Sequence, residues 1–547
     1  MKKRISITLA TVSALLVSTT LLGSIPATIY SGNASEFSWP FLSALLLYWP
    51  YALGGILASA LIASILPRGG AAAWSSVVAI LAFFVWAHGT FQFVPLTLLD
   101  GQNWTTESST GWLAIDIASS AVIILLFGLL VRKNTRGALV LLGILSIGAI
   151  AQTAMAVSTD KKPMPSTTLV DQSFYQFSTN KNVLVILLDA MQSDVFEDAM
   201  QLHRDVEAAF QGFEYFPDTA AVSTTTYLAI PTIHSGLLYE GKEPLQEVYN
   251  DWVVKRSFMS QLAHAGYQGT MINAVLDKCP SGLTICTTAA SVLASPEAQR
   301  KSDAARLVDV TLLRIVPAAM RGAVYNDGKW TVGNFVQQSD TRHFSVEGNA
   351  VLRKLSLGLT NTASQPTVKF LHLFSTHLPV SIGTNCEFIG EQKELTRPAY
   401  TAQIGCALSS VADLFAAMKK AGVYDDTAIV VMADHGTTGL GSARQPSGKG
   451  EISTNLIGVA NPTLAFKPIG SKGSFASSAK SMSLADVAGL ICGNVGDCSA
   501  PKRGPTRLFN RYTWDVKYWS SDTVPDLTTF DISGIEWNPN SWAKRVE

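Results

Sequence analysis

The hydrophobic positions divide the chain into two parts. Five long apolar runs occupy the first 157 residues: Ile5–Ile25, Trp39–Leu66, Ser75–Leu98, Trp112–Val131 and Ala138–Val157. Each approaches the ~20 residues that an α-helix needs to cross a hydrocarbon layer about 30 Å thick. Five such runs in succession are not typical of soluble proteins. The pattern therefore predicts a transmembrane domain of five helices over residues 1–157.

Basic residues lie at alternate ends of these runs. They precede the first run, separate the second from the third, and separate the fourth from the fifth: Lys2, Lys3, Arg4, Arg68, Arg132, Lys133 and Arg136. By the positive-inside rule the N-terminus is cytoplasmic and the chain leaves the fifth helix on the outer side. The alternative is that the first run is a cleaved signal peptide, because basic residues precede it. Either interpretation places the large remainder outside the cytoplasm.

Short apolar runs dominate the second part of the chain. Residues 158–180 are polar and rich in Ser and Thr, which predicts a linker. Beyond it, "NVLVILLD", "TVKFLHLFSTH" and "TAIVVMADHG" are apolar runs of strand length, and the first shows no alternation, as in a strand buried on both faces. Stretches with helical spacing separate them. Residues 181–547 are therefore predicted to form a doubly wound α/β domain.

Polar residues with metal-binding chemistry follow these predicted strands. Asp189, His377, Asp434 and His435 come at or just after their carboxyl ends, where α/β sheets bind ligands. Two carboxylates and an imidazole suit Zn²⁺ or Mn²⁺. A lone aspartate at a strand end commonly caps the next helix or turn instead. The adjacent pair Asp434-His435 serves little packing purpose and favours a metal.

Composition and cysteines restrict the function classes. The net charge is zero and charged residues are sparse, so the chain lacks the basic footprint of a nucleic-acid-binding protein. All six cysteines lie beyond the membrane part, and an even number in an exported domain predicts disulfides. Fifteen pairings are possible; sequence proximity favours Cys279–Cys286, Cys386–Cys406 and Cys492–Cys498.

The segment "AVSTTTYLAIPTIHSG", from Ala221 to Gly236, carries four consecutive hydroxyl side chains. A hydroxyl becomes an effective nucleophile when a metal or a helix N-terminus lowers its pKa. A threonine at the entry to a helix beside a bound cation would have both. The segment therefore predicts a nucleophile among Ser223, Thr224, Thr225 and Thr226.

Taken together, these motifs resemble the alkaline-phosphatase superfamily, and more closely its membrane-anchored, sulfatase-like branch of phosphoethanolamine transferases and lipoteichoic-acid synthases. The resemblance is carried, in this order, by "NVLVILLDAMQSD", "TYLAIPTIHSG", "HLFSTHLP", "GVYDDTAIVVMADHG" and "NPTLAFKPIG". It covers nearly the whole chain. It implies five N-terminal transmembrane helices, a linker and an outer catalytic domain with the sulfatase-like α/β fold.

The resemblance also implies a set of site residues. The superfamily's nucleophile commonly stands ten residues before the Gly of a Thr/Ser-Gly pair, and in the phosphoethanolamine transferases five before a proline. Ser235-Gly236 and Pro231 both select Thr226 by this spacing, with Thr225 and Thr224 as fallbacks. One divalent ion, Zn²⁺ or Mn²⁺, is expected on Asp189, Thr226, Asp434 and His435.

Three further residues are expected to contact the substrate. His377 matches a histidine that contacts the substrate or leaving group, and His372 matches a second one in the phosphoethanolamine transferases. His372 can also be interpreted as a buried strand histidine. Lys449, in the Gly-rich "GTTGLGSARQPSGKGE", is available to an anionic substrate, although a solvated loop is the plainer interpretation.

The chain departs from the family pattern in two places. Asp189 stands where the two named families have Glu. The phosphoethanolamine transferases carry another histidine shortly after Asp-His-Gly, whereas His435 is the last histidine here, which favours one metal rather than two. A sulfatase that matures Cys to formylglycine needs the motif C-x-P-S-R. The sequence "KCPSG" at Cys279 lacks the spacer and the Arg, and no other cysteine fits, so this class of sulfatase is excluded.

The resemblance predicts an enzyme of the cytoplasmic (inner) membrane with its catalytic domain on the periplasmic or extracellular side. It would transfer phosphoethanolamine or phosphoglycerol from a membrane phospholipid to an envelope glycan or lipid through a phospho-threonine. Two alternatives stay open: a phosphodiesterase or other phosphohydrolase that uses water as acceptor, and a non-catalytic lipid-binding protein on the same fold. The Trp- and Tyr-rich segment from Arg511 is expected to form a small strand subdomain.

Overall fold

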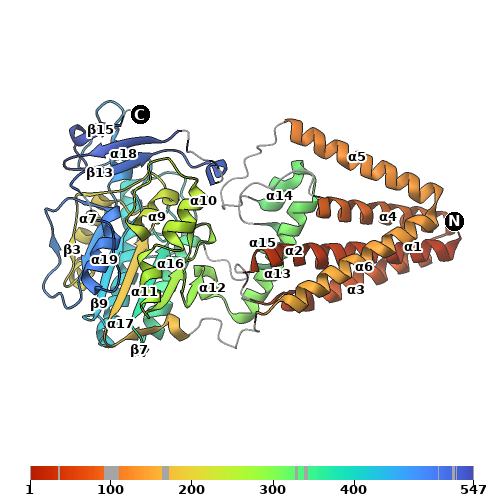
Figure 1. Ribbon diagram of the computed structural model, residues 1–547, viewed down its shortest axis with the longest axis horizontal. Helices are drawn as coiled ribbons and strands as arrows, with labels where there is room; N and C mark the ends of the chain where they lie inside the picture. The colour runs from red at the N-terminus through yellow and green to blue at the C-terminus, as the bar shows by residue number, and fades with distance from the viewer. Residues whose placement is uncertain are drawn as a thin grey trace. The chain divides into compact units, whose positions relative to one another are not determined.

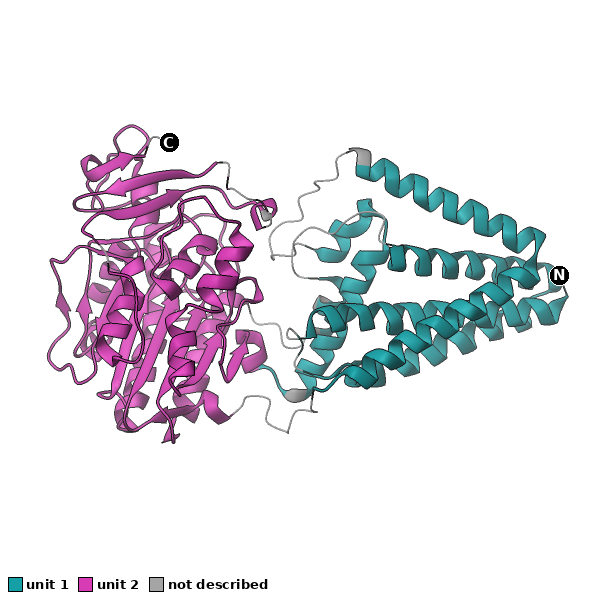
Figure 2. Ribbon diagram, in the orientation of Figure 1, with its two compact units in different colours: residues 1–169, 294–341 teal, residues 170–293, 342–547 magenta. Residues whose placement is uncertain are grey.

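The computed structural model describes residues 2–34, 37, 39–91, 110–162, 172–326, 330–337, 343–502, 504–519, 521, 524 and 526–545. Residues 163–171 of the predicted linker, and residues 92–98 at the end of the third apolar run, lie outside the described residues. The chain forms two compact units (Figure 2): residues 1–169 with 294–341, and residues 170–293 with 342–547.

Unit 1 contains the five predicted apolar helices. The first is continuous through a π-helical turn; the segments are α1 (Lys3–Thr19), η1 (Thr20–Ser24), α2 (Ile25–Gly32), α3 (Phe41–Ile65), α4 (Arg68–Phe91), α5 (Thr110–Lys133) and α6 (Thr135–Thr159). Many large apolar side chains on these helices are exposed, among them Leu61, Leu125 and Ile147. A soluble protein seldom exposes such a surface, and a bilayer would cover it.

By length and composition, six helices among the described residues could cross a membrane. Five lie within residues 3–159, as the sequence predicts. The sixth is α17 (Arg397–Lys420) of unit 2, in whose apolar window 67% of the residues are buried. Its apolar residues pack in the core of unit 2, which explains its hydropathy without a membrane.

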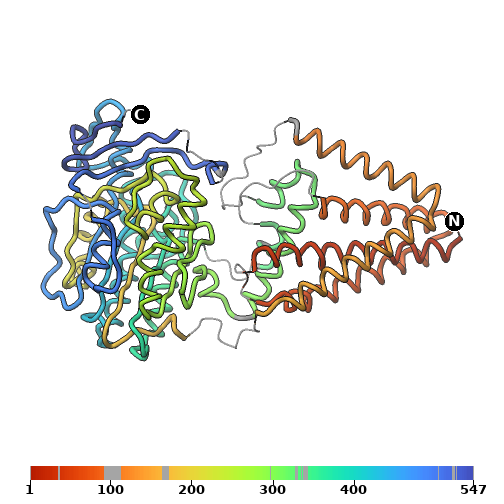
Figure 3. The backbone as a smooth tube through the Cα atoms, in the orientation of Figure 1, coloured from red at the N-terminus to blue at the C-terminus, as the bar shows by residue number. Residues whose placement is uncertain are grey.

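Residues 294–341 belong to unit 1, although the residues before and after them in the sequence belong to unit 2. It forms α13 (Pro296–Ile315), η6 (Ala318–Met320), α14 (Arg321–Tyr325) and α15 (Thr331–Gln337), green in Figure 3. Leu307 of α13 is buried in one cluster with Ile25 and Val85 of the apolar helices, and the Tyr48 hydroxyl donates to the Ala304 carbonyl at 2.5 Å. The domain boundaries predicted from the sequence include this segment in the outer domain, residues 181–547.

Unit 2 is built on an eight-stranded sheet, in the order β11-β3-β10-β9-β2-β8-β5-β6 among the described residues (Figure 1). Its strands are β2 (Asn182–Leu188), β3 (Glu214–Tyr215), β5 (Gln268–Ile272), β6 (Ile285–Thr287), β8 (Thr367–Leu373), β9 (Thr427–Met432), β10 (Leu464–Lys467) and β11 (Ala476–Ser477). The central strands β9, β2, β8 and β5 are parallel, and β10 is antiparallel to both neighbours.

Helices cover both faces of this sheet. On β2, Val185 and Leu187 belong to one core cluster and Leu184 and Ile186 to the other, which explains why this strand shows no polar alternation. One face carries α7 (Ser193–Leu202), α16 (Phe344–Gly358) and α17. The other carries α9 (Thr226–Ser235), α11 (Phe258–His264), α18 (Thr454–Ala460) and α19 (Val487–Val495). The predicted α/β fold is therefore present.

The remaining elements of unit 2 are short. They are β1 (Gln176–Ser178), α8 (Arg204–Ala209), β4 (Thr219–Ala220), α10 (Leu245–Val248), α12 (Ala289–Leu293), β7 (Thr360–Ala363), β12 (Met482–Ser483), β13 (Arg507–Arg511), β14 (Thr528–Ile532) and β15 (Trp542–Lys544). The last three form an antiparallel sheet, as expected for the C-terminal segment. The disulfides Cys279–Cys286, Cys386–Cys406 and Cys492–Cys498 are those that sequence proximity favours.

Candidate metal centre and nucleophile

Three neighbouring parallel strands bring the predicted ligands together. Asp189 directly follows β2, Asp434 follows β9, and β8 lies on the other side of β2. The Asp189 amide donates to the Leu373 carbonyl at the end of β8 at 3.0 Å. The Ala190 amide donates to Asp434 Oδ1 at 3.2 Å. The carboxyl ends of β2, β8 and β9 therefore form one edge that carries the site.

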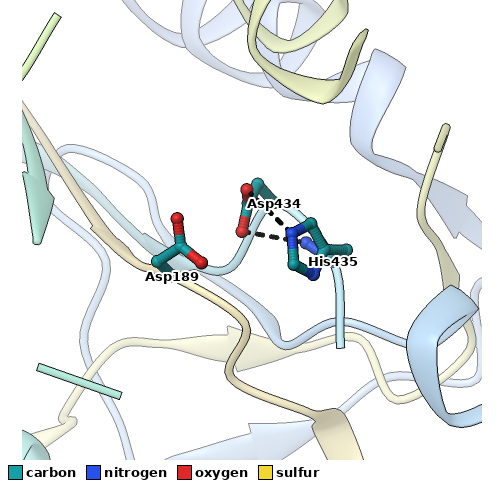
Figure 4. A group of neighbouring side chains, drawn as sticks. All are labelled: Asp189, Asp434 and His435. Atoms are coloured by element: carbon teal, nitrogen blue, oxygen red, sulfur yellow. Dashed lines mark hydrogen bonds and ion pairs between the residues drawn. The ribbon is translucent and has the colours of Figure 1, made fainter. Parts of the chain in front are cut away.

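Asp189, Asp434 and His435 form a cluster that could hold a cation. One ligand atom from each lies within 4.8 Å of the other two, and Figure 4 shows the three side chains facing a common space. Asp189 Oδ1 and Asp434 Oδ2 are buried without a hydrogen-bond partner among the described residues. Buried carboxylate oxygens are costly without a partner. The orphaned oxygens and the mixed oxygen and nitrogen donor set fit a divalent metal.

The tautomer of His435 suits metal binding. Its Nδ1 lies 2.8 Å from the Gly436 carbonyl, so Nδ1 carries the proton and donates it there. Nε2 then presents a lone pair toward the cluster, 3.4 Å from Asp434 Oδ2. Burial disfavours the charged imidazole, but the carboxylates of Asp434 and Asp189 outweigh it and raise the pKa of His435. A metal ion would compete with the proton for Nε2.

Thr226 is the hydroxyl that the structure places beside this cluster. It is the first residue of α9, and its Oγ1 lies 3.3 Å from His435 Nε2 and 3.5 Å from Asp189 Oδ2. The neighbouring hydroxyls are used elsewhere. Thr224 and Thr225 donate to Tyr512, and Ser223 Oγ accepts from the Thr225 amide.

The two carboxylate oxygens of Asp189 have different neighbours. His372 Nε2 lies 2.9 Å from Oδ2, which leaves Oδ1 for the cluster. Burial raises the pKa of Asp189, but His377, His372 and His435 outweigh it and hold this pKa below its usual range. His372 is fully buried, so its imidazole faces Asp189 and is not open to solvent. The structure thus places His372 against Asp189, and the substrate contact of His372 stays a prediction.

His377 lies at the mouth of the site. Its Nε2 is 3.9 Å from Asp189 Oδ1 and its side chain is 44% exposed. Its Nδ1 donates to the Leu378 carbonyl, so Nε2 is the ring nitrogen that faces Asp189. Lys449 is exposed and donates to Asn540 Oδ1 at 2.6 Å; among the described residues, no hydrogen bond or ion pair joins it to the cluster. Arg444 is paired with Glu197 and stacked over Trp537.

Several residues that support the site were not identified from the sequence. Ala190, directly after Asp189, has a positive φ of 62°, a conformation that costs energy for a residue with a Cβ. Its carbonyl accepts from the hydroxyls of Tyr400 and Thr437, each at 2.8 Å. The Thr376 hydroxyl donates to the Asp189 carbonyl at 2.6 Å. Thr376 and Thr437 are adjacent to the histidine motifs, which was the only signal for them.

Comparisons with known proteins identify a family. A family model described as "Sulfatase" matches residues 181–491. No curated protein sequence matches the chain. Solved structures similar to the chain include three with the following values. "Ps i-CgsB" has 13% identity, 67% and 86% of the two chains covered, and a TM-score of 0.41. The lipoteichoic acid synthase LtaP from Listeria monocytogenes is 11% identical, with 68% of this chain and 88% of that chain covered and a TM-score of 0.38. The C-terminal periplasmic domain of EcEptC from Escherichia coli is 10% identical, with 58% of this chain and 82% of that chain covered and a TM-score of 0.32.

Proposed function

Because the chain belongs to the sulfatase family, whose model covers residues 181–491, we propose that it is a metal-dependent phosphotransferase. It takes phosphoethanolamine or phosphoglycerol from a membrane phospholipid and passes it to an envelope glycan or lipid. The observation that carries this proposal is the position of Thr226. Its hydroxyl stands at the N-terminus of α9, within 3.5 Å of Asp189 Oδ2 and His435 Nε2.

The residues of the cluster fit one divalent ion, Zn²⁺ or Mn²⁺. Asp189, Asp434 and His435 would hold it, with Thr226 as a further ligand. When bound, the ion supplies the positive charge that lowers the pKa of a hydroxyl and offsets the charge of a phosphoryl oxygen. The positive end of the α9 dipole acts in the same direction on Thr226.

In the first half-reaction, Thr226 Oγ attacks the phosphorus of the phospholipid after losing its proton to solvent. The Thr226 Oγ–P bond forms, and the bond from phosphorus to the diacylglycerol oxygen breaks. His377, half-exposed at the mouth of the site, enters this step with a proton on both ring nitrogens and donates the one on Nε2 to the departing oxygen. The products are diacylglycerol, which stays in the bilayer, and a phospho-threonine that carries the head group.

In the second half-reaction, a hydroxyl of the acceptor attacks the same phosphorus. His377, now neutral, accepts the proton of that hydroxyl at Nε2. The new O–P bond forms as the Thr226 Oγ–P bond breaks, and Thr226 regains a proton. The enzyme thereby returns to its starting state, with the head group on an envelope glycan or lipid.

The apolar helices of unit 1 support a lipid donor. They give the chain a membrane anchor, which keeps the enzyme at the surface where phospholipid head groups are found. We place unit 2 on the periplasmic or extracellular side of the cytoplasmic membrane. The basic residues at alternate helix ends support this side, as do three disulfides, which persist in oxidising compartments.

The test is mass spectrometry of the full-length chain in detergent. The protein is incubated with phosphatidylethanolamine or phosphatidylglycerol and with Mn²⁺ or Zn²⁺. We expect a phospho-head-group adduct on Thr226 and release of diacylglycerol in the wild type and in Thr226→Ser, which keeps the hydroxyl. Thr226→Val, which keeps the shape without the hydroxyl, should form no adduct. Release of the head group into water without any acceptor would identify a hydrolase, and no adduct with any of the four combinations would contradict the lipid donor.

A further inference from the structure

His234, in the last turn of α9, is a fully buried histidine whose ring nitrogens are unused. Among the described residues, neither its Nδ1 nor its Nε2 has a hydrogen-bond partner. Burial lowers the pKa of His234 to about 3, with a further contribution from His372, so the ring is neutral and carries one N–H donor and one acceptor nitrogen. Buried polar groups in native proteins almost always have partners, because an unmade bond is costly. These two nitrogens therefore indicate a small ligand in the core.

A third unused nitrogen lies on the strand beneath α9. His372 of β8 is also fully buried, and its Nδ1 has no hydrogen-bond partner among the described residues, whereas its Nε2 is bonded to Asp189. Phe370 and His372 are two residues apart on β8, so their side chains point to the same face of the sheet. The ring of His234 packs against Phe370 with centroids 4.7 Å apart, which brings it next to His372.

The surroundings of the two histidines restrict what this ligand can be. Phe258 of α11 stacks on His234 with centroids 5.6 Å apart, and Phe258 and Phe370 both belong to the apolar core on this face of the sheet. A metal ion is not indicated, because the metal-binding group found among the described residues does not include His234. Buried water molecules typically bond to about three polar atoms that otherwise lack partners. Water is therefore the ligand that fits these nitrogens.

We propose that a buried water molecule joins His234 to Nδ1 of His372, and that His234 is thereby a positioning residue for the metal centre. Water both donates and accepts hydrogen bonds, so it can bond to an imidazole nitrogen on each side. His372 Nε2 in turn bonds to Asp189 Oδ2 at 2.9 Å. This chain connects the helix that begins at Thr226 with a metal ligand, and it fixes the orientation of the His372 ring. The inference rests on the metal centre of the proposed function and not on the lipid donor.

A double-mutant cycle tests whether His234 acts through His372. His234→Leu keeps an apolar side chain of similar size and removes both nitrogens, so the His372 ring loses its fixed orientation. We expect the affinity of the full-length protein for Mn²⁺, measured by calorimetry, to fall about 10-fold, the lower end of the range for outer partners of metal ligands. His234→Gln can still bond to water and should recover most of this loss. In the His372→Leu background, His234→Leu should have no further effect, because the chain to Asp189 is already broken.

Thr270→Val is the matched control. The Thr270 hydroxyl of β5 is also fully buried without a partner among the described residues, but Thr270 pairs with Lys369 of β8, so its side chain points to the face opposite His372. This variant should bind Mn²⁺ like the wild type, and the Tm of each metal-free variant checks that it folds.

Equal Mn²⁺ affinity in the wild type and His234→Leu, including no measurable binding in either, would overturn the proposal. So would equal losses in His234→Leu and His234→Gln, or a further loss in the His372→Leu background, since His234 would then act through packing. The adduct experiment tests the transfer reaction separately. A chain that shows these differences in Mn²⁺ affinity and forms no adduct would contradict the proposed function alone.

Discussion

Two of the sets of buried carboxylates among the described residues of unit 2 have different surroundings. In the first set, Asp189 and Asp434 at the strand ends have only imidazoles as possible cations, and one oxygen of each lacks a hydrogen-bond partner among the described residues. In the second set, Asp218 lies beside Glu536, and Asp218 Oδ1 accepts from Arg507 at 2.9 Å and from the Glu536 amide at 2.8 Å. The second set contains its own cation, and the first does not.

Glu536 sharpens this comparison. Both of its carboxylate oxygens also lack partners among the described residues. However, burial raises the pKa of Glu536 well above its usual value, with a further contribution from Asp218 that opposes the effect of Arg507. Burial therefore favours the neutral form of Glu536, whereas the histidines hold the pKa of Asp189 low. An orphaned oxygen on an ionised carboxylate indicates a missing cation, and one on a neutral acid does not.

The largest effect is expected from Asp434→Asn. The substitution keeps the shape and the hydrogen bonds that Asp434 Oδ1 accepts from the amides of Ala190 and His435, but it removes a ligand charge. Metal affinity should fall by more than the about 100-fold that loss of an outer partner costs, and adduct formation should disappear with it. Calorimetry with Mn²⁺ and Zn²⁺ measures this, with the Tm of the metal-free protein as the control. Wild-type metal affinity in this variant would remove Asp434 from the site.

Asp218→Asn should lower the stability of the protein and leave its metal affinity unchanged. It leaves the buried Arg507 without its carboxylate, which costs about 3 kcal/mol of unfolding free energy. The metal affinity of the folded protein should not change, because Asp218 takes no part in the cluster. Thermal unfolding and calorimetry on the same preparation check both statements. A variant that keeps its Tm and loses metal would show that the two sets are not distinct in role.

His372 provides an intermediate effect. His372→Leu removes the hydrogen bond that fixes Asp189 Oδ2, and metal affinity should weaken about 10- to 100-fold. His372→Gln can still donate from its side-chain amide and should recover most of this loss. Metal titration of both variants is the measurement. Equal weakening by Leu and Gln would mean that His372 acts through packing and does not orient Asp189.

The effect of Glu536→Gln is expected to vanish at low pH, because it depends on the titration of a single buried group. An unfolded Glu releases its proton near its ordinary pKa of 4.5, whereas folded Glu536 keeps its proton to a much higher pH. Between these values the folded state holds the extra proton, so wild-type stability falls as pH rises, by at most about 1.4 kcal/mol per pH unit. Gln cannot titrate. Its Tm should exceed the wild-type Tm near pH 8 and match it near pH 4; an identical difference at both values would contradict a neutral Glu536.

The sequence predicted the elements whose pattern is local. The apolar run of β2 and the runs of β8 and β9 end at the residues that form the site, and parallel neighbours bring such ends together by geometry. The family resemblance, applied to the spacing of Pro231 and Gly236, selected Thr226, which lies beside the cluster. Proximity also selected the three disulfide pairs, because each closes a short loop.

What the sequence did not predict depends on contacts between distant segments. A strand histidine can face either side, and only the pairing of β8 with β2 places His372 against Asp189. Helix α13 has an ordinary amphipathic pattern, which does not say that its apolar face packs on the helices of unit 1. The Thr225–Tyr512 bond spans 287 residues, and no local pattern marks it.

A crystal structure of the full-length chain grown with Mn²⁺, with an anomalous difference map, would test the central claim most directly. We predict one peak, in contact with Asp189 Oδ1, Asp434 Oδ2 and His435 Nε2 and next to Thr226 Oγ1. No peak should lie near Asp218 and Glu536, where Arg507 and a neutral acid already balance the charge. An empty cluster at saturating Mn²⁺, or a peak at the arginine-paired set, would contradict the metal centre.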